Sequence, residues 1–396
     1  MGRGGHTDSR GELPRNFLLL CFMGAFAIFS STMSKSPTLS WFSEFLGASD
    51  FEIGLIAAAS TITGIFVNVT AGSLSDVYGR RKMLIISGLI FASAPFLYLG
   101  VTEIWQLVLF RIYHGFATAI FMPVSLAYIA DMFSSRRGEF MGIFSSSTMI
   151  GRLLAPIAAG FLVSIQFLAP FQLAYLVCGI VGVIAMISSF RIKPVAHREI
   201  VGESKANVIE GLKTIIRNIS IIIVSLAEAA TYFSMGAIET FMPIYSDTIG
   251  IEKWITGILM SLQVLTIALF RPIAGLLSDK YGRKPFIIAG LAVSAVSLFF
   301  LPLTNNVLGL LLVMIIYGFG VSLTTSSTSP LISEVSSKTA LGSGMGALET
   351  IKDVGHATGP IVAGFFIGAL GFFPAFSIIT LVLVSVLTTI YVKLKV

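Results

Sequence analysis

The residues best placed to do chemistry are ionisable side chains that fall inside otherwise apolar stretches. The densest group occupies one face of a predicted helix, at spacings of three, four and seven residues from its first member: Glu349, Lys352, Asp353 and His356. Lys352 can neutralise one carboxylate and leave the other free to bind a proton, and imidazole exchanges protons near neutral pH. The pattern indicates a proton-exchange site or, alternatively, an ion lock completed by Arg271 or Arg152.

Two further acids lie in one earlier apolar stretch. Glu228, near its middle, is a candidate for binding a proton or a cation, and Tyr232 lies one helical turn further on the same face. The alternative is an acid that is hydrogen-bonded to a neighbouring helix. Glu239, near the end of the stretch, is predicted to form a salt bridge with Lys35 that closes the outer mouth of a cavity. A solvated pair of loop residues is the alternative there.

The elements that position these residues are predicted to be membrane spans. Hydrophobic residues make up 55% of the 396 residues and charged residues only 12%, which excludes an ordinary soluble domain. Apolar runs of about 20 residues can cross a bilayer, and a charge inside one costs about 2.5–3.5 kcal/mol on insertion scales. The predicted spans are 16–36, 51–73, 83–101, 104–128, 140–163, 170–190, 218–245, 254–277, 285–303, 307–330, 344–369 and 373–392.

Lysine and arginine are concentrated on one side of these spans, where the connecting segments and the termini hold 20 of the 26. The positive-inside rule therefore places both termini and the middle segment in the cytoplasm, with the protein in the cell membrane. The net charge of +6 then has a membrane explanation, and no nucleic-acid partner is expected. The predicted division is a cytoplasmic tail at 1–15, a six-helix half at 16–190, a cytoplasmic linker at 191–217 and a second six-helix half at 218–396.

The stretch Gly72–Lys82 occurs again as Gly275–Lys284, at an offset of 203 residues. A long internal repeat predicts two similar halves around a central cavity. Each copy is predicted to form a short loop in which glycine lets the chain turn and the basic residues pair with acids across the interface. The loop residues expected to form this latch are Gly72, Asp76, Gly79, Arg80 and Arg81, and Gly275, Asp279, Gly282, Arg283 and Lys284.

These two stretches resemble the signature G-x-L-[SA]-D-x-x-G-R-[RK] of the major facilitator superfamily, which lies between its helices 2 and 3 and again between 8 and 9. Arg111 and Gly115 resemble the family's R-x-x-x-G motif, in which the arginine is associated with proton coupling. His114 stands where that motif often has glutamine. An arginine bound to a neighbouring helix is the alternative role for Arg111.

The stretch 142–160 resembles a helix-5 pattern of the drug/proton antiporters in this family, with Ala155 and Ala159 in place of glycine. Small residues let helices pack closely, and proline bends a helix by removing a hydrogen bond. The residues expected to bend or pack the two repeated spans are Gly151, Pro156 and Gly160, and Gly355, Gly359 and Pro360. Well-packed kinked helices without a role in antiport are the alternative.

The resemblance implies an all-α membrane protein of twelve helices in two halves, acting as a monomer on a small molecule. It favours proton-coupled efflux of lipophilic or cationic compounds, through a cavity lined by Lys35, His114, Arg152, Tyr232 and Glu239. Symport or uniport of an organic anion or another small metabolite is the alternative, supported by Lys35, Arg111 and Arg152. A non-transporting receptor or scaffold on this fold is a further alternative. It predicts degraded loop signatures, whereas both copies of the signature are intact. No phosphate loop, metal-ligand spacing or nucleophile–base motif occurs, so neither catalysis nor a cofactor is expected.

Overall fold

The computed structural model describes residues 14–133, 136–165, 171–195, 219–335 and 341–394, and its regular elements there are helices. Those before the predicted linker are α1 (Arg15–Lys35), α2 (Thr38–Phe45), α3 (Asp50–Tyr78), α4 (Arg80–Leu97), η1 (Tyr98–Gly100), α5 (Ile104–Met132), α6 (Arg137–Ser164) and α7 (Gln172–Arg191). Those after it are α9 (Ile219–Thr248), α10 (Lys253–Tyr281), α11 (Arg283–Phe300), η2 (Leu301–Leu303), α12 (Val307–Val335), α13 (Leu341–Leu370) and α14 (Phe372–Lys393).

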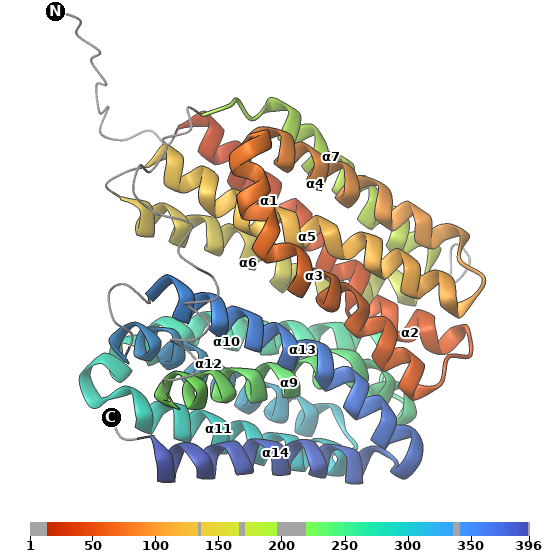
Figure 1. Cartoon of the computed structure of the whole chain (residues 1–396). Coiled ribbons are helices and arrows are strands. Elements are labelled where there is room, and N and C mark those ends of the chain that lie inside the picture. Colours follow the sequence, from red (N-terminus) through yellow and green to blue (C-terminus); the bar gives the residue numbers. More distant parts are fainter. Residues whose placement is uncertain (1–13, 134–135, 166–170, 196–218, 336–340, 395–396) are drawn as a thin grey trace, which may run out of the picture.

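Twelve helical stretches among the described residues are long and apolar enough to cross a membrane, which is the number predicted. They form two bundles, α1–α7 and α9–α14, that lie against each other (Figure 1). Hereafter these bundles are the N-terminal and the C-terminal half. The predicted linker and tail fall largely outside the described residues.

The repeated stretch is not the loop that the sequence predicted. Helix α3 continues through Gly72 and Asp76 to Tyr78, and α4 starts at Arg80, so the chain turns at Gly79 alone. The second copy turns in the same way at Gly282. Both glycines have a positive φ, 92° and 94°, which a residue with a side chain adopts only with strain. In each copy, a single glycine therefore makes the turn for which the sequence predicted a longer loop.

A short helix that was not predicted, α2, marks one end of the bundle. Trp41 on α2 is buried, and its Nε1 donates a hydrogen bond to the Pro243 carbonyl oxygen of α9, 3.2 Å away. Buried tryptophan N–H groups need such a partner. This contact fastens the N-terminal half to the C-terminal half.

The halves also meet through α3 with α13 and through α6 with α10. A side chain on Gly54 would collide with the Pro360 carbonyl oxygen, and one on Gly257 with that of Pro156. Because α3 and α10 both start near these glycines, the two contacts lie at the α2 end. The opposite end, where the chain turns at Gly79 and Gly282, is here called the turn end.

Candidate functional site

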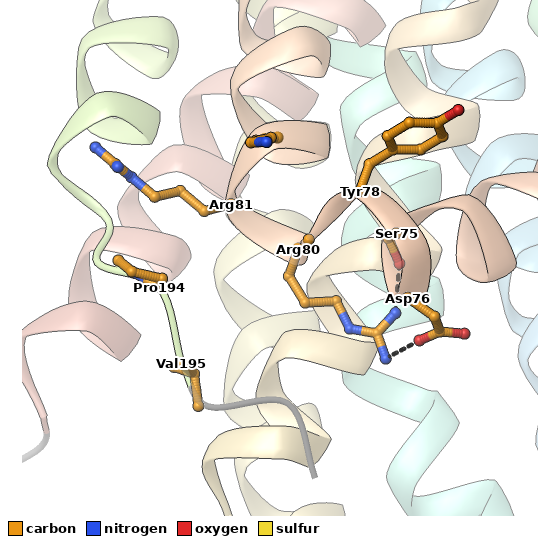
Figure 2. A pocket seen from close by; sticks show the side chains of 9 residues that line it. Ser75, Asp76, Tyr78, Arg80, Arg81, Pro194 and Val195 are labelled. Carbon is orange, nitrogen blue, oxygen red and sulfur yellow. Dashed lines mark hydrogen bonds and ion pairs between the residues drawn. The ribbon is translucent and has the colours of Figure 1, made fainter. Parts of the chain in front are cut away.

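Arg80 closes the last turn of α3 at the turn end. Its guanidinium donates to the Gly72 carbonyl oxygen at 3.3 Å and to the Ser75 hydroxyl. It also pairs with Asp76 at 2.5 Å and with Asp131 of α5 at 3.0 Å. Figure 2 shows the guanidinium turned toward Ser75 and Asp76. Arg80 thus satisfies an exposed helix end and ties α3 to α5.

Arg283 repeats this arrangement in the C-terminal half, 203 residues later. Its four partners are Gly275, Ser278, Asp279 and Glu334. The neighbouring cations also bind within their own half, Arg81 to the Phe190 carbonyl oxygen at 3.0 Å and Lys284 to that of Leu394 at 2.5 Å. Among the residues that the structure describes, none of these four cations pairs with an acid of the other half. The latch itself stays a prediction.

A polar group that joins the halves lies nearer the α2 end. Lys35 Nζ of α1 is 3.2 Å from Glu239 Oε2 of α9, which confirms the predicted salt bridge. His356 Nε2 of α13 is 3.2 Å from the same oxygen and 3.4 Å from Lys35 Nζ. Its Nδ1 is 3.4 Å from the Thr61 hydroxyl of α3. The Ser36 hydroxyl donates to the Glu239 carbonyl oxygen at 2.7 Å.

The charged residues on one face of α13 interact with different partners. Lys352 pairs with Glu349, and its ammonium group lies 5.3 Å from the centre of the Tyr232 ring. Asp353 instead accepts a hydrogen bond from Asn68 of α3 at 3.2 Å. One carboxylate is therefore neutralised by Lys352, and the other faces the N-terminal half.

Glu228 is buried inside the C-terminal half, with 3% of its surface exposed. Its carboxylate accepts a hydrogen bond from the Thr328 hydroxyl of α12. No basic side chain of the described residues lies within salt-bridge distance. Lys352 and Arg271 are near enough to act on it electrostatically. An ionised carboxylate at this place lacks a direct counter-ion, which makes Glu228 suited to carry a proton.

Tyr232 lies on the same helix, half-buried, with positive charges around it. Its ring is 6.1 Å from that of His356, and Arg152 of α6 and Arg271 of α10 act on it electrostatically. Both arginines are exposed, and no carboxylate of the described residues forms a salt bridge with either. Arg152 of the N-terminal half thus acts electrostatically on Tyr232 of the C-terminal half, and a shared place in a cavity stays a prediction.

Arg111 and His114 lie elsewhere, in the core of the N-terminal half. Arg111 is 2% exposed and donates a hydrogen bond to the Ser60 hydroxyl of α3. His114 is 1% exposed and packs between the rings of Phe91 and Tyr98. The prediction that His114 lines the cavity is wrong, because its position on α5 turns it into the bundle.

The predicted small residues sit at the closest helix contacts. A side chain on Gly151 would collide with the Ala25 carbonyl oxygen of α1, and one on Gly355 with that of Ala229 on α9. Gly359 and Gly160 meet backbone in the same way. Close packing is confirmed, and α6 and α13 stay helical through their prolines. The bend remains a prediction.

Several partners at these sites were not found from the sequence: Ser60, Thr61, Asn68 and Thr328. They are neutral, so their position inside an apolar span gave no energetic signal. The repeat did contain a signal for two of them, since at the offset of 203 Asn68 corresponds to Arg271 and Ser60 to Gln263.

Comparisons with known proteins extend over nearly the whole chain. The family model described as Major Facilitator Superfamily matches residues 20–261 and 224–395. An "Uncharacterized MFS-type transporter MJ1560" of Methanocaldococcus jannaschii is 23% identical over 366 residues, covering 91% of this chain and 93% of the relative. "Multidrug resistance protein 2" of Bacillus subtilis is 26% identical over 336 residues, covering 83% of each.

Among solved structures, a bacterial homologue of the human lysosomal transporter Spinster, in an inward-facing and occupied conformation, superposes with a TM-score of 0.82. Its sequence is 14% identical, and the match covers 96% of this chain and 97% of that one. At this identity the likeness concerns the fold.

Proposed function

Because this chain belongs to the major facilitator superfamily of membrane transporters, we propose that it exports lipophilic or cationic small molecules in exchange for protons. Transport by alternating access, and not catalysis, is the activity of such a protein. A relative named for multidrug resistance supports the substrate class.

Glu228 is the observation that carries the proposal. It is buried, it is held by a neutral hydroxyl, and two cations are near it without forming a salt bridge. Protonation removes a charge that the membrane interior disfavours. Release of the proton leaves a carboxylate that attracts Lys352, Arg271 or a cationic substrate. Proton and cation then compete for one site, as exchange requires.

The contacts between the halves support alternating access. The hydrogen bonds between described residues of opposite halves run from the α2 end only as far as Asn68 and Asp353. At the turn end, Arg80 and Arg283 bind within their own halves. With the basic turn end in the cytoplasm, this arrangement is a state closed to the outside. Lys35, Glu239 and His356 form the outer gate, and the protein works as a monomer in the cell membrane.

Transport of an organic anion is the second candidate. Arg152 and Arg271 are exposed without a carboxylate partner among the described residues, on opposite halves, and both act on Tyr232. Two guanidinium groups that act on one aromatic residue and have no carboxylate partner among the described residues fit a carboxylate-bearing compound.

The test uses purified protein in liposomes with an imposed pH gradient and an internal pH dye. Tetraphenylphosphonium serves as the cation and benzoate as the anion. We expect the cation to trigger proton movement, and Glu228→Gln to reduce it at least tenfold. Glutamine still accepts the Thr328 hydrogen bond but carries no exchangeable acid proton.

Glu139→Gln is the matched control, since Glu139 is exposed and pairs with its neighbour Arg136. It should move protons as the unmodified protein does. Full activity of Glu228→Gln would refute its role as the proton site. A response to benzoate alone, lost in Arg152→Gln, would support the second candidate instead.

A further inference from the structure

We propose that the N-terminal half binds a chloride ion in its core, between Arg111, Tyr98, Tyr175 and His114. This site is separate from the binding site of the transported molecule and from the Glu228 proton site. The inference does not depend on the substrate.

The first argument is an uncompensated charge. Arg111 is 2% exposed, it donates to the Ser60 hydroxyl, and its Nε has no partner. No carboxylate of the described residues forms a salt bridge with it. A guanidinium is always charged, and a buried charge without a counter-ion is costly in a protein and more so in a membrane. A small anion would remove that cost.

The second argument is a set of hydrogen-bonding groups that lack partners. The Tyr98 and Tyr175 rings stack at 4.7 Å and 22°; Tyr98 lies within hydrogen-bonding reach of the Arg111 side chain, and the Tyr175 hydroxyl has no hydrogen bond. His114 lies beside Tyr98, and both of its ring nitrogens are unpartnered. Arg111 acts electrostatically on all three residues. Hydroxyls, an imidazole N–H and a guanidinium N–H can all donate to one anion.

The third argument comes from the repeat. At the offset of 203, Arg111 corresponds to Met314 and Tyr98 to Leu301, both buried. The counterpart of His114 is Tyr317, whose hydroxyl pairs with that of Ser234 at 2.7 Å. The same fold is therefore built in the C-terminal half without a buried charge at these positions. The polar cluster of the N-terminal half is not required for packing.

The burial of the cluster limits the ligand to a small monovalent anion. Tyr98, Arg111, His114 and Tyr175 are each at most 2% exposed. Because these side chains are closed off from solvent, a single-atom anion needs less room there than an organic anion does, and one negative charge balances the single guanidinium. Chloride meets both conditions.

The experiment measures thermal unfolding of the purified full-length protein in sodium gluconate and in sodium chloride at equal ionic strength. We expect chloride to raise the midpoint by about 3–5 °C with saturation, as a ligand of the folded state does. Arg111→Met, which copies the C-terminal half, should abolish the rise. Arg136→Met removes an exposed arginine outside both proposed sites and should keep the rise, so a general salt effect is distinguished.

An equal chloride response in Arg111→Met would overturn the proposal. If that variant does not fold, anomalous diffraction from crystals of the unmodified protein in sodium bromide decides. An anomalous peak between Arg111 and the two tyrosine hydroxyls supports the site. Water density without such a peak refutes it.

Discussion

In the N-terminal half, the fourth span buries Arg111 and His114, whereas the matching positions of the C-terminal half hold Met314 and Tyr317. The C-terminal half places its ionisable groups differently. Glu239 and His356 contact the N-terminal half directly, and Glu228 is buried between α9 and α12. The two halves thus share a scaffold but not a distribution of charge.

The scaffold residues explain what the halves share. Gly79 and Gly282 turn the chain with nearly equal φ, and Arg80 and Arg283 bind corresponding partners. These contacts involve backbone atoms and helix ends, which every copy of the fold contains. Charged side chains outside these two arginine clusters are not needed for the scaffold, so each half can place them differently. We therefore expect scaffold changes to act alike in both halves and charge changes to act differently.

The largest effect on stability is expected at the glycine contacts. Gly151→Ala and Gly355→Ala each place a methyl group against a backbone carbonyl oxygen of the adjacent helix. Each should destabilise the protein by about 1–3 kcal/mol, measured by thermal unfolding in detergent. Gly142→Ala is the control, because its added methyl meets no atom within 4 Å. A large loss in one half alone would break the shared-scaffold comparison.

The salt bridge between the halves comes next. Lys35 and Glu239 are partly buried, with side chains 23% and 26% exposed. A double-mutant cycle of Lys35→Met and Glu239→Gln should give a coupling energy of about 1–2 kcal/mol, between that of exposed and buried pairs. The exposed pair Arg136–Glu139 is the reference and should give less. Equal coupling energies for the two pairs would contradict a role of Lys35 in the proposed outer gate.

A smaller difference separates the two arginine clamps. The Asp131 side chain is 10% exposed, whereas that of Glu334 is 52% exposed. Asp131→Asn should therefore destabilise the protein by about 1 kcal/mol more than Glu334→Gln, because solvent screens the second pair. Thermal unfolding of both variants tests this. The reverse order would show that burial does not set the strength of these pairs.

The smallest effect on stability is expected at the exposed acids of the repeat. Asp76→Asn and Asp279→Asn change side chains that are about half exposed and should each cost less than about 0.5 kcal/mol. Transport should nevertheless slow several-fold in liposomes if these residues latch the turn end. Normal transport by correctly inserted Asp76→Asn would leave the acids with a structural role only.

The pairing of Lys35 with Glu239 was predictable because the repeat aligns Glu239 with Ser36, beside Lys35. The burial of His114 was not, because a helix in a bundle has several buried faces and the sequence does not say which neighbour each face meets. The helical turn at Gly79 was also missed. Polar residues such as Asp76 suggest a loop. They belong instead to the last turns of α3, where Arg80 pairs with Asp76 and donates to the Gly72 carbonyl oxygen.

The sequence by itself determined the number of spans, the two halves and the positions that must be small or charged. These follow from the length of apolar runs, the repeat and the cost of a charge in a membrane. Apart from the Lys35–Glu239 pair, only the tertiary structure decided which charges have partners. Glu228 meets a hydroxyl and Arg111 meets Ser60, because helices far apart in the chain bring those groups together. Electrostatic energy depends on distances across helices, and spacing along the chain does not fix them.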